Sequence, residues 1–300
     1  MSGRRDRVPR AQAEQPIDRV DFLVIGAGPT GLGAAAHLEQ READYLVVDA
    51  ADRVGGAAAA QVDRHRFSWS VAGVTGAQWN TIAERLVDPR RLQLDTRIVH
   101  VDIARRTAIL ADGRAIDYRW CISSAPLPTA LSWAGARDLG VGLRARRALV
   151  VGLGFRGDVP AGLASALDAS DAPWTRLAEI SELAPEQHWS IIAELPLPGY
   201  EDADADASIA AVLAGLRGFD AAPSRPVTTW AREFSPAHPE PMEDRDERLR
   251  EIDALLRSHG FFSRGLFGGW RPEVADLEGA YQQGGEAVEA ILEGASEDAY

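Results

Sequence analysis

The sequence predicts an α/β fold in which a Rossmann-like parallel sheet with a β-meander is joined to a smaller α+β region built on an antiparallel sheet. The first observation is a strand–turn–helix–strand order: an apolar run at 22–25, a glycine-rich turn, a helix-favouring segment to Gln40, and a second apolar run at 45–48. The other two observations are alternating apolar residues in the middle of the chain and three strand-like runs in its second half.

The glycine-rich turn has the spacing G-x-G-x-x-G, formed by Gly26, Gly28 and Gly31. We expect Gly26 to permit a tight turn, Gly28 to let the backbone approach a pyrophosphate, and Gly31 to let the helix pack closely on the strand. Pro29 and Thr30 begin the helix, whose free N–H groups and positive dipole end attract phosphates. The turn therefore predicts a dinucleotide site.

An acidic residue, Asp49, ends the second apolar run, 18 residues after Gly31. A carboxylate at this point can accept hydrogen bonds from the hydroxyls of the adenosine ribose. Its negative charge disfavours a phosphate on the 2′ oxygen, because two negative charges would meet there. The sequence therefore favours a dinucleotide whose adenosine ribose is unphosphorylated at that position.

The middle and the second half of the chain predict two further sheet regions. Apolar residues alternate from Ile98, an Asp112–Gly113 turn follows, and an apolar strand is expected at 120–123, so these residues form a meander. The strands expected beyond residue 136 are 147–153, 189–194 and 227–234, with an amphipathic helix at 208–216.

Composition and charge exclude several function classes. The length of 300 residues suggests about two domains. The net charge of −13 disfavours nucleic acid and anionic membrane surfaces as partners. The single cysteine, Cys121, rules out an internal disulfide and fits a reducing compartment, so we predict a cytoplasmic protein with this thiol buried.

No metal site and no membrane span are expected. The sequence has no H-x-x-x-H or paired-cysteine motif, and no apolar run approaches the ~20 residues of a membrane helix. Residues 1–19 are polar and charged and are expected to be disordered. The pair Arg4–Arg5 is not followed by a separate apolar signal core, because the first apolar run after it is the strand that leads into the glycine-rich turn. This argues against an export signal.

Four stretches resemble the flavoprotein superfamily that includes the amine oxidases, protoporphyrinogen oxidase and UDP-galactopyranose mutase. They are ADRVGG after Asp49, residues 56–76, YRWCISSAPLPTAL at 118–131, and residues 260–292. The sequence at 118–131 most resembles the mutase-like branch of this superfamily. The resemblance implies a Rossmann-like FAD-binding domain. FAD is favoured over NAD because nicotinamide sites do not require the Gly-Gly that follows the acid, nor the closing stretch.

The resemblance also implies which residues hold the FAD. In that superfamily Arg53 and the Gly55–Gly56 turn would lie near the ribose and pyrophosphate, and the backbone at Ile98 would pack against adenine. The last helix, expected at 278–292, would point its N-terminus at the isoalloxazine, where its dipole stabilises negative charge. The implied set is Gly26, Gly28, Pro29, Thr30, Gly31, Asp49, Ala50, Arg53, Gly55, Gly56, Ile98, Ser124, Ala125, Pro126, Gly265, Gly268, Gly269, Asp276 and Leu277.

The chain departs from the superfamily at the flavin ring. Ser70 and residues 72–74 stand where an acid and a Gly-Gly usually lie, and Leu266 follows Gly265 where an arginine is usual. The substrate-covering helical insertion is reduced to a remnant at 76–91. No catalytic acid or base can be named, and the lost arginine weighs against a galactopyranose mutase, whose anionic sugar nucleotide needs cationic clamps.

The implied domains are a discontinuous FAD-binding domain at 20–75, 92–135 and 258–300 and a substrate domain at 136–257. The implied function is an FAD-dependent oxidoreductase that removes a hydride from an amine or a carbon–carbon or carbon–nitrogen bond. Two alternatives remain: a degenerate FAD-binding protein that acts as a partner subunit, and a redox-neutral mutase or isomerase. The short insertion suggests an open flavin face that suits a small-molecule or carrier-bound substrate, or a partner subunit.

Overall fold

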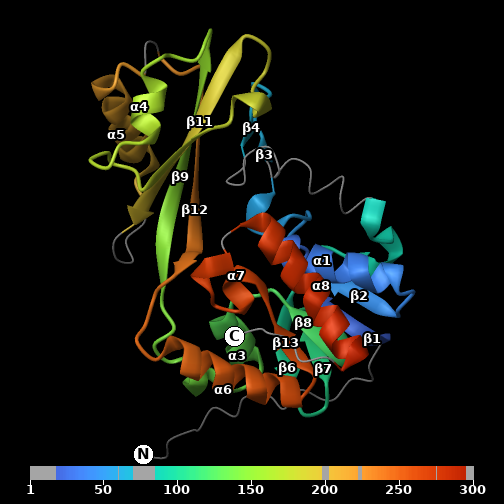
Figure 1. The fold of residues 1–300 in the computed structure, drawn as a ribbon. Helices are drawn as coiled ribbons and strands as arrows, with labels where there is room; N and C mark the ends of the chain where they lie inside the picture. The colour runs from blue at the N-terminus through green and yellow to red at the C-terminus, as the bar shows by residue number, and fades with distance from the viewer. Residues whose placement is uncertain are drawn as a thin grey trace, which may run out of the picture.

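The computed structural model describes residues 18–59, 61–69, 85–197, 203–221, 225–274 and 276–294. Residues 1–17 of the expected tail, Ser70, residues 72–74 and most of the helical remnant at 76–91 lie outside this description. Within it, the strands form one mixed sheet, one antiparallel sheet that stands above it, and a short hairpin (Figure 1).

The mixed sheet contains the strand–turn–helix–strand unit that the sequence predicts. β1 pairs in parallel with β2 on one side and with β8 on the other, and β5 extends the sheet beyond β2. The described strand order is β5-β2-β1-β8-β7-β6, with β13 also paired to β8. The strands are β1 (Asp18–Ile25), β2 (Tyr45–Val48), β5 (Leu92–Gln93), β6 (Ile98–Asp102), β7 (Thr107–Leu110), β8 (Ala115–Ser123) and β13 (Phe261–Ser263).

The strand β8 joins the parallel part of the sheet to the meander. Its first residues pair antiparallel with β7, while Cys121 and the residues after it pair in parallel with β13. Cys121 is fully buried, and burial raises the pKa of its thiol. The thiol is therefore a small buried apolar group, as its apolar surroundings in the sequence predict.

Helices cover both faces of the mixed sheet. α1 (Pro29–Gln40) and α8 (Leu277–Glu293) share one buried cluster with β1 and β2. α3 (Leu127–Trp133) and α6 (Arg245–Ser258) share the cluster on the other face. The predicted domain boundary places α6 in the substrate domain, whereas its Leu249, Ile252 and Leu256 pack into the core of the mixed sheet. An amphipathic pattern shows that a helix buries one face, but it does not show against which sheet.

Glycines let α1 and α8, the first and last helices, lie in backbone contact (Figure 1). A Cβ on Gly33 would lie 1.9 Å from the carbonyl oxygen of Tyr281, and a Cβ on Gly284 would lie 1.9 Å from that of Thr30. On α8 Val288 is fully buried, whereas Leu292, in the last turn, is 43% exposed.

The second sheet is antiparallel throughout, with the order β10-β11-β9-β12. Its strands are β9 (Ala145–Arg156), β10 (Arg176–Glu179), β11 (His188–Leu197) and β12 (Thr228–Pro239). α4 (Leu163–Leu167) and α5 (Ala205–Gly218) cover one face, where Val151 and Val212 share a buried cluster. Three strands and α5 match the sequence prediction to within a few residues, while β10 and α4 have no counterpart in it.

The hairpin of β3 (Gln61–Val62) and β4 (Ser68–Trp69) packs on the other face of this sheet. The Trp69 ring stacks on the Trp230 ring, with 6.2 Å between centroids. The Asp63 carboxylate accepts hydrogen bonds from Trp69 Nε1 at 3.1 Å and from Thr228 Oγ1 at 2.8 Å. Burial acts to raise the pKa of Asp63, but these and two backbone N–H bonds outweigh it and hold the pKa below its usual range.

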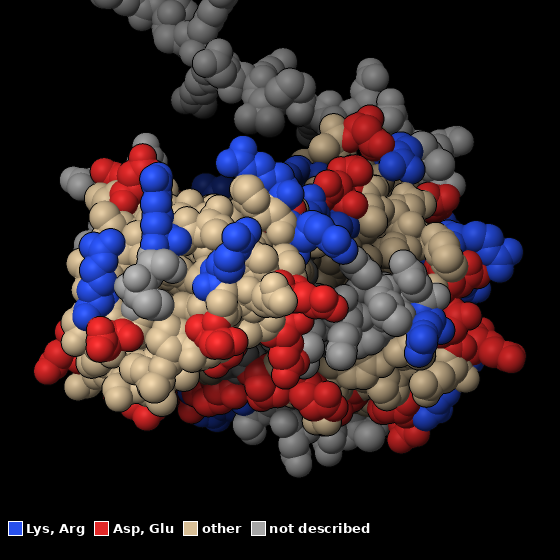
Figure 2. Space-filling view, turned by 90° about the horizontal axis from the view of Figure 1, so that it is seen from above, with Lys and Arg blue, Asp and Glu red and all other residues tan. Residues whose placement is uncertain are grey.

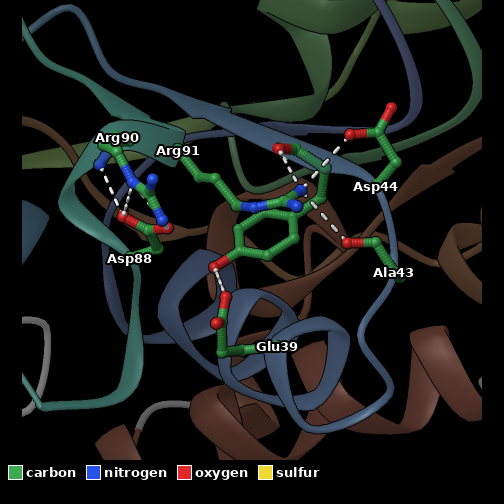
Figure 3. Close-up of polar contacts among 7 residues, drawn as sticks. Glu39, Ala43, Asp44, Asp88, Arg90 and Arg91 are labelled. Atoms are coloured by element: carbon green, nitrogen blue, oxygen red, sulfur yellow. Dashed lines mark hydrogen bonds and ion pairs between the residues drawn. The ribbon is translucent and has the colours of Figure 1, made fainter.

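A polar cluster anchors the amino end of β2 (Figure 3). The Arg91 guanidinium lies over the Tyr45 ring at 4.9 Å and donates to the carbonyl oxygens of Ala43 and Tyr45. The Tyr45 hydroxyl donates to Glu39 at 2.6 Å, and burial together with this carboxylate raises the pKa of the phenol. The cluster therefore joins β2 to α1 and to the turn η2 (Pro89–Arg91) that precedes β5.

Short helical turns complete the chain. They are α7 (Gly265–Gly268), η1 (Gly56–Ala58), η2 (Pro89–Arg91), η3 (Arg137–Gly140), η4 (Ser181–Leu183) and η5 (Pro272–Val274). No helix in the described ranges combines the length and the apolarity that a membrane crossing requires. Acidic and basic side chains are interspersed on the face seen in Figure 2.

Candidate functional site

A cleft of about 390 Å³ lies at the carboxyl ends of β1, β2 and β8. Ligands of open α/β sheets bind at this edge, because the loops that follow the strands converge there. Fourteen of the residues that the sequence implies for the cofactor line the cleft: Gly26, Gly28, Pro29, Thr30, Asp49, Ala50, Gly56, Ile98, Ser124, Ala125, Pro126, Gly265, Asp276 and Leu277.

The first glycine turn needs its glycines for different physical reasons. Gly26 has φ +103°, and a Cβ there would lie 2.2 Å from Ser124 Oγ. A Cβ on Gly31 would lie 1.7 Å from the Gly26 carbonyl oxygen, so this glycine brings the helix onto the turn. Gly28 is different: its φ is −79°, and a Cβ would meet only Gly56 Cα, at 3.8 Å. Neither backbone strain nor protein packing requires glycine at Gly28, which opens on the cleft.

Asp49 ties the loop after β1 to the loop after β2. Its Oδ2 accepts from the Ala27 N–H at 2.6 Å, and its Oδ1 accepts from the Ala51 N–H at 2.7 Å. Its own N–H donates to the carbonyl oxygen of Gln93, the last residue of β5, and its carbonyl oxygen accepts from the Thr96 N–H. The carboxylate is therefore held rigidly in the cleft wall, where a ribose can reach it.

A second glycine turn lies against the first. Gly55 and Gly56 have φ +98° and +56°, and the Gly55 N–H donates to the Ala27 carbonyl at 2.7 Å. A Cβ on Gly56 would lie 3.2 Å from Gly28 Cα, so two bare backbones form one wall of the cleft. No side chain caps the start of α1, which leaves its first N–H groups to the cleft.

Five implied residues do not line the cleft: Gly31, Arg53, Gly55, Gly268 and Gly269. Arg53 pairs with the adjacent Asp52, with Nε 2.8 Å from Oδ1. Gly268 serves packing, because a Cβ there would lie 2.8 Å from the Ser123 carbonyl oxygen. Among the described residues that line the cleft, Arg97 is the cationic one. The sequence signal for Arg97 is only its place before Ile98.

A buried ion pair stabilises the part of the cleft wall that comes from the C-terminal region of the chain, at Gly265. Arg264 and Asp253 are 3% and 6% exposed, and Arg264 Nη1 lies 2.7 Å from Asp253 Oδ1. Gly265 follows with φ +84°; a Cβ there would lie 2.2 Å from Thr30 Oγ1, and its N–H donates to Gln283 Oε1 at 2.9 Å. The pair therefore fixes α6 to the turn that reaches the cleft.

At the start of α8 the side chain of Asp276 caps the helix. Its Oδ1 accepts from the Gly279 N–H at 2.6 Å, and Asp276 and Leu277 both line the cleft. The sequence implies a helix N-terminus that faces the flavin ring. The structure brings this N-terminus to the cleft with a carboxylate already bound to it, which offsets part of its positive dipole end.

A second cavity, of about 460 Å³, adjoins the first and shares six wall residues with it: Ala57, Ala58, Leu266, Phe267, Asp276 and Leu277. Its opposite wall comes from the antiparallel sheet, through residues such as Val150 and Phe234. The polar side chains of that wall are Arg176, Glu194 and His238. Sequence reasoning does not find this site, because its residues come from strands that are far apart in the chain.

The described cleft suits a flavin dinucleotide. Bare backbone at two glycine turns and uncapped N–H groups suit a pyrophosphate, and Asp49 suits a ribose. The cavity beyond Leu266 leaves room for a reactive ring and a second molecule. Among the described residues no group of three or more His, Cys, Asp or Glu side chains could hold a metal ion.

Sequence comparisons agree with the nucleotide-binding part. Residues 24–88 match the family described as NAD(P)-binding Rossmann-like domain. A curated relative, "Lysine-specific histone demethylase 1 homolog 3" of Arabidopsis thaliana, is 36% identical over 107 residues, which is 32% of this chain. The match spans only 6% of the length of that relative.

Solved structures extend the likeness to nearly the whole chain. A reduced UDP-galactopyranose mutase superposes with a TM-score of 0.83 at 17% identity, over 93% of this chain and 95% of that one. Putrescine oxidase bound to putrescine gives 0.67 at 12% identity, over 92% and 99%. A fatty acid isomerase from P. acnes gives 0.64 at 11%, over 91% and 98%. At these identities the likeness is one of fold.

Proposed function

We propose that this chain, which has the fold of the flavoprotein superfamily containing the amine oxidases and UDP-galactopyranose mutase, binds FAD and removes a hydride from a small organic substrate. The observation that carries the FAD proposal is Gly28. Its ordinary φ of −79° and the one ordinary contact that a Cβ would make, with Gly56 Cα at 3.8 Å, mean that the protein itself does not need glycine there. A bare backbone at this point serves a ligand that approaches it, as a pyrophosphate does.

Different residues of the cleft would bind different parts of the cofactor. The two glycine turns and the start of α1 would hold the pyrophosphate, Asp49 the adenosine ribose, and Ile98 the adenine. The segments at Ser124 and at Gly265 would flank the ring. Bound flavin supplies the hydride acceptor, and the chain's own part is to position the substrate and exclude water. The adjoining cavity, with Leu266 and Phe267 in the shared wall, is the proposed substrate site.

The test is a matched pair of glycine variants. Gly28→Val is expected to fold normally, because its φ and its surroundings accept a side chain, but to lower FAD affinity by at least tenfold, ~1.4 kcal/mol. Gly218→Ala is the control, because Gly218 lies in α5 with no atom within 4 Å of a Cβ. Purified proteins are reconstituted with FAD and their absorbance is recorded near ~370 and ~450 nm, where bound flavin absorbs. A wild-type chain that holds no flavin, or a Gly28→Val chain that holds it equally well, contradicts the proposal.

A second candidate function is a redox-neutral flavin isomerase or mutase. It is favoured by the fold likeness to UDP-galactopyranose mutase and to a fatty acid isomerase. The apolar Leu266 in the shared wall argues against an anionic sugar nucleotide as the substrate. The two functions differ in electron balance: a redox-neutral isomerase or mutase would consume no oxidant, whereas an oxidoreductase would consume one oxidant per turnover.

A further inference from the structure

A histidine–carboxylate pair lies at the second cavity, in the wall that the antiparallel sheet provides. His238 Nε2 lies 2.6 Å from Glu194 Oε1, and both residues line the cavity that adjoins the cleft. The side chain of Glu194 is 18% exposed and that of His238 is 49% exposed. The carboxylate is therefore the inner partner, and the imidazole is the outer partner that a molecule in the cavity can reach.

Strand geometry explains how two distant residues meet. Glu194 lies opposite Val150 of β9, while His238 lies opposite Arg146, four residues away on β9. The register of β12 shifts between Phe234 and His238, where β12 has two more residues than the facing stretch of β9. Bulges re-aim the side chains of a strand. The small side chain of Ala148 lies between the two on β9 and lines the same cavity, so the pair can close across this strand.

The hydrogen bond selects the tautomer. A carboxylate can only accept, so Nε2 carries the hydrogen that it donates to Glu194. Nδ1 is then the nitrogen with a lone pair, and among the described residues it has no hydrogen-bond partner. A histidine oriented by a carboxylate through one nitrogen, with the other nitrogen available, is the arrangement of a general base.

The remaining charged groups near the pair are mixed in sign. Arg176 lies cross-strand to Glu194, and Arg232 lies over the Phe234 ring at 5.0 Å. Arg146, cross-strand to His238, pairs with Glu240 at 4.0 Å. Asp276 and Glu278 contribute carboxylates from the start of α8.

We propose that His238, positioned by Glu194, is the proton acceptor of the second cavity, and that this cavity takes an apolar molecule whose reacting carbon bears an O–H or N–H group. The proposal rests on the proposed function. In the step, the substrate's C–H bond would break and its electron pair would leave as hydride to bound oxidised flavin. The O–H or N–H bond breaks, its proton passes to Nδ1, and its electron pair forms the new C=O or C=N bond.

The first test needs neither flavin nor substrate. The Nε2–H signal of His238 is observed by NMR and assigned by its loss in His238→Asn. In the wild-type chain this signal is expected to be visible, because the Glu194 carboxylate accepts the hydrogen and slows its exchange with solvent; in Glu194→Ala it is expected to be lost through fast exchange. The ring N–H of His259, at the end of α6, is the internal reference and should be the same in both chains. A His238 signal that is unchanged in Glu194→Ala overturns the pair.

The second test measures proton transfer in the FAD-loaded chain. Benzyl alcohol and benzylamine are the probes, one for each kind of proton donor, and the reduction of bound flavin is followed by anaerobic stopped-flow. His238→Asn is expected to slow reduction by about 10²-fold or more, while His259→Asn, the matched control, stays at the wild-type rate.

The outcomes separate the two proposals. A His238→Asn rate within twofold of His259→Asn overturns the role of His238 while leaving the FAD function intact. A wild-type flavin that neither probe reduces overturns the substrate class. A chain that never holds flavin contradicts the proposed function, and the NMR signal of the His238 Nε2–H then still decides whether His238 and Glu194 act as a pair.

Discussion

The buried pair Asp253–Arg264 shows how single residues support the cleft from a distance. Neither side chain lines it, yet Arg264 immediately precedes Gly265, which does. Taking two charges out of water is costly, so such a pair adds little stability over an apolar pair, but removing one partner is strongly destabilising. Its contribution here is position: it fixes α6 to the turn that reaches the cleft.

A chain that lacks the Asp253 carboxylate is therefore expected to unfold more readily. Asp253→Ala should lower the free energy of unfolding by about 3–5 kcal/mol, because the buried Arg264 loses its counter-charge. Asp246→Ala is the control on the same helix, where Asp246 is 64% exposed in its pair with Arg245, and should cost less than about 1 kcal/mol. Urea denaturation gives both values, and equal losses would show that burial of the pair is irrelevant.

At the scale of elements, the contact of α1 with α8 joins the two ends of the described chain. Helices held by ordinary side chains lie 8–10 Å apart, whereas the glycines here place each backbone against a carbonyl of the other helix. No rotamer change can relieve a Cβ at 1.9 Å from a backbone oxygen, so the whole helix would have to move.

Gly284→Ala is thus expected to lower stability and to weaken FAD binding together, since Thr30 lies on both the contact and the cleft. Gly218→Ala should instead stabilise by about 0.5–1 kcal/mol, because alanine favours a helix where space is free. Thermal melts and FAD titrations of the two variants check this. A Gly284→Ala chain with the wild-type melting temperature would contradict this prediction, because it would mean that α1 and α8 can move apart without loss of stability.

The hairpin β3–β4 is expected to loosen in acid. The pKa of Asp63 is held below its usual range in the folded chain, so its contribution is present above the unfolded pKa of about 3.9 and is lost as the pH falls through the folded pKa. The near-UV circular dichroism of Trp69 and Trp230 should therefore decline in that window. In Asp63→Asn the signal should be weaker at neutral pH and independent of pH there; a parallel decline in both proteins would exclude Asp63 as the cause.

At the scale of the whole molecule, FAD is expected to act as a stabilising ligand. At a hundredfold excess over its Kd it should stabilise the folded chain by about 2.7 kcal/mol, a rise of several degrees in melting temperature. ADP, which carries only the adenosine and pyrophosphate part, should give a smaller rise, and FMN little or none. A larger rise with FMN than with ADP would contradict the assignment of Asp49 to the adenosine end.

Local chemistry made the first glycine turn and the end of β2 predictable from sequence. Gly26 has a positive φ and Asp49 directly follows β2, and both features depend on a few neighbouring residues of the chain. Arg53 pairs with the adjacent Asp52 in the structure, and its place near the pyrophosphate stays a prediction. His238 and Glu194 lie 44 residues apart on strands separated by β9, so no spacing rule could join them.

The glycine crossing of α1 and α8 also has a consequence for the order of synthesis. The turn that begins at Gly26 emerges from the ribosome long before Gly284, the residue that lets the last helix close against it. Until that helix has been made, the face of α1 that packs against it has no partner there. If the chain binds FAD as proposed, we therefore expect binding only after α8 has been synthesised.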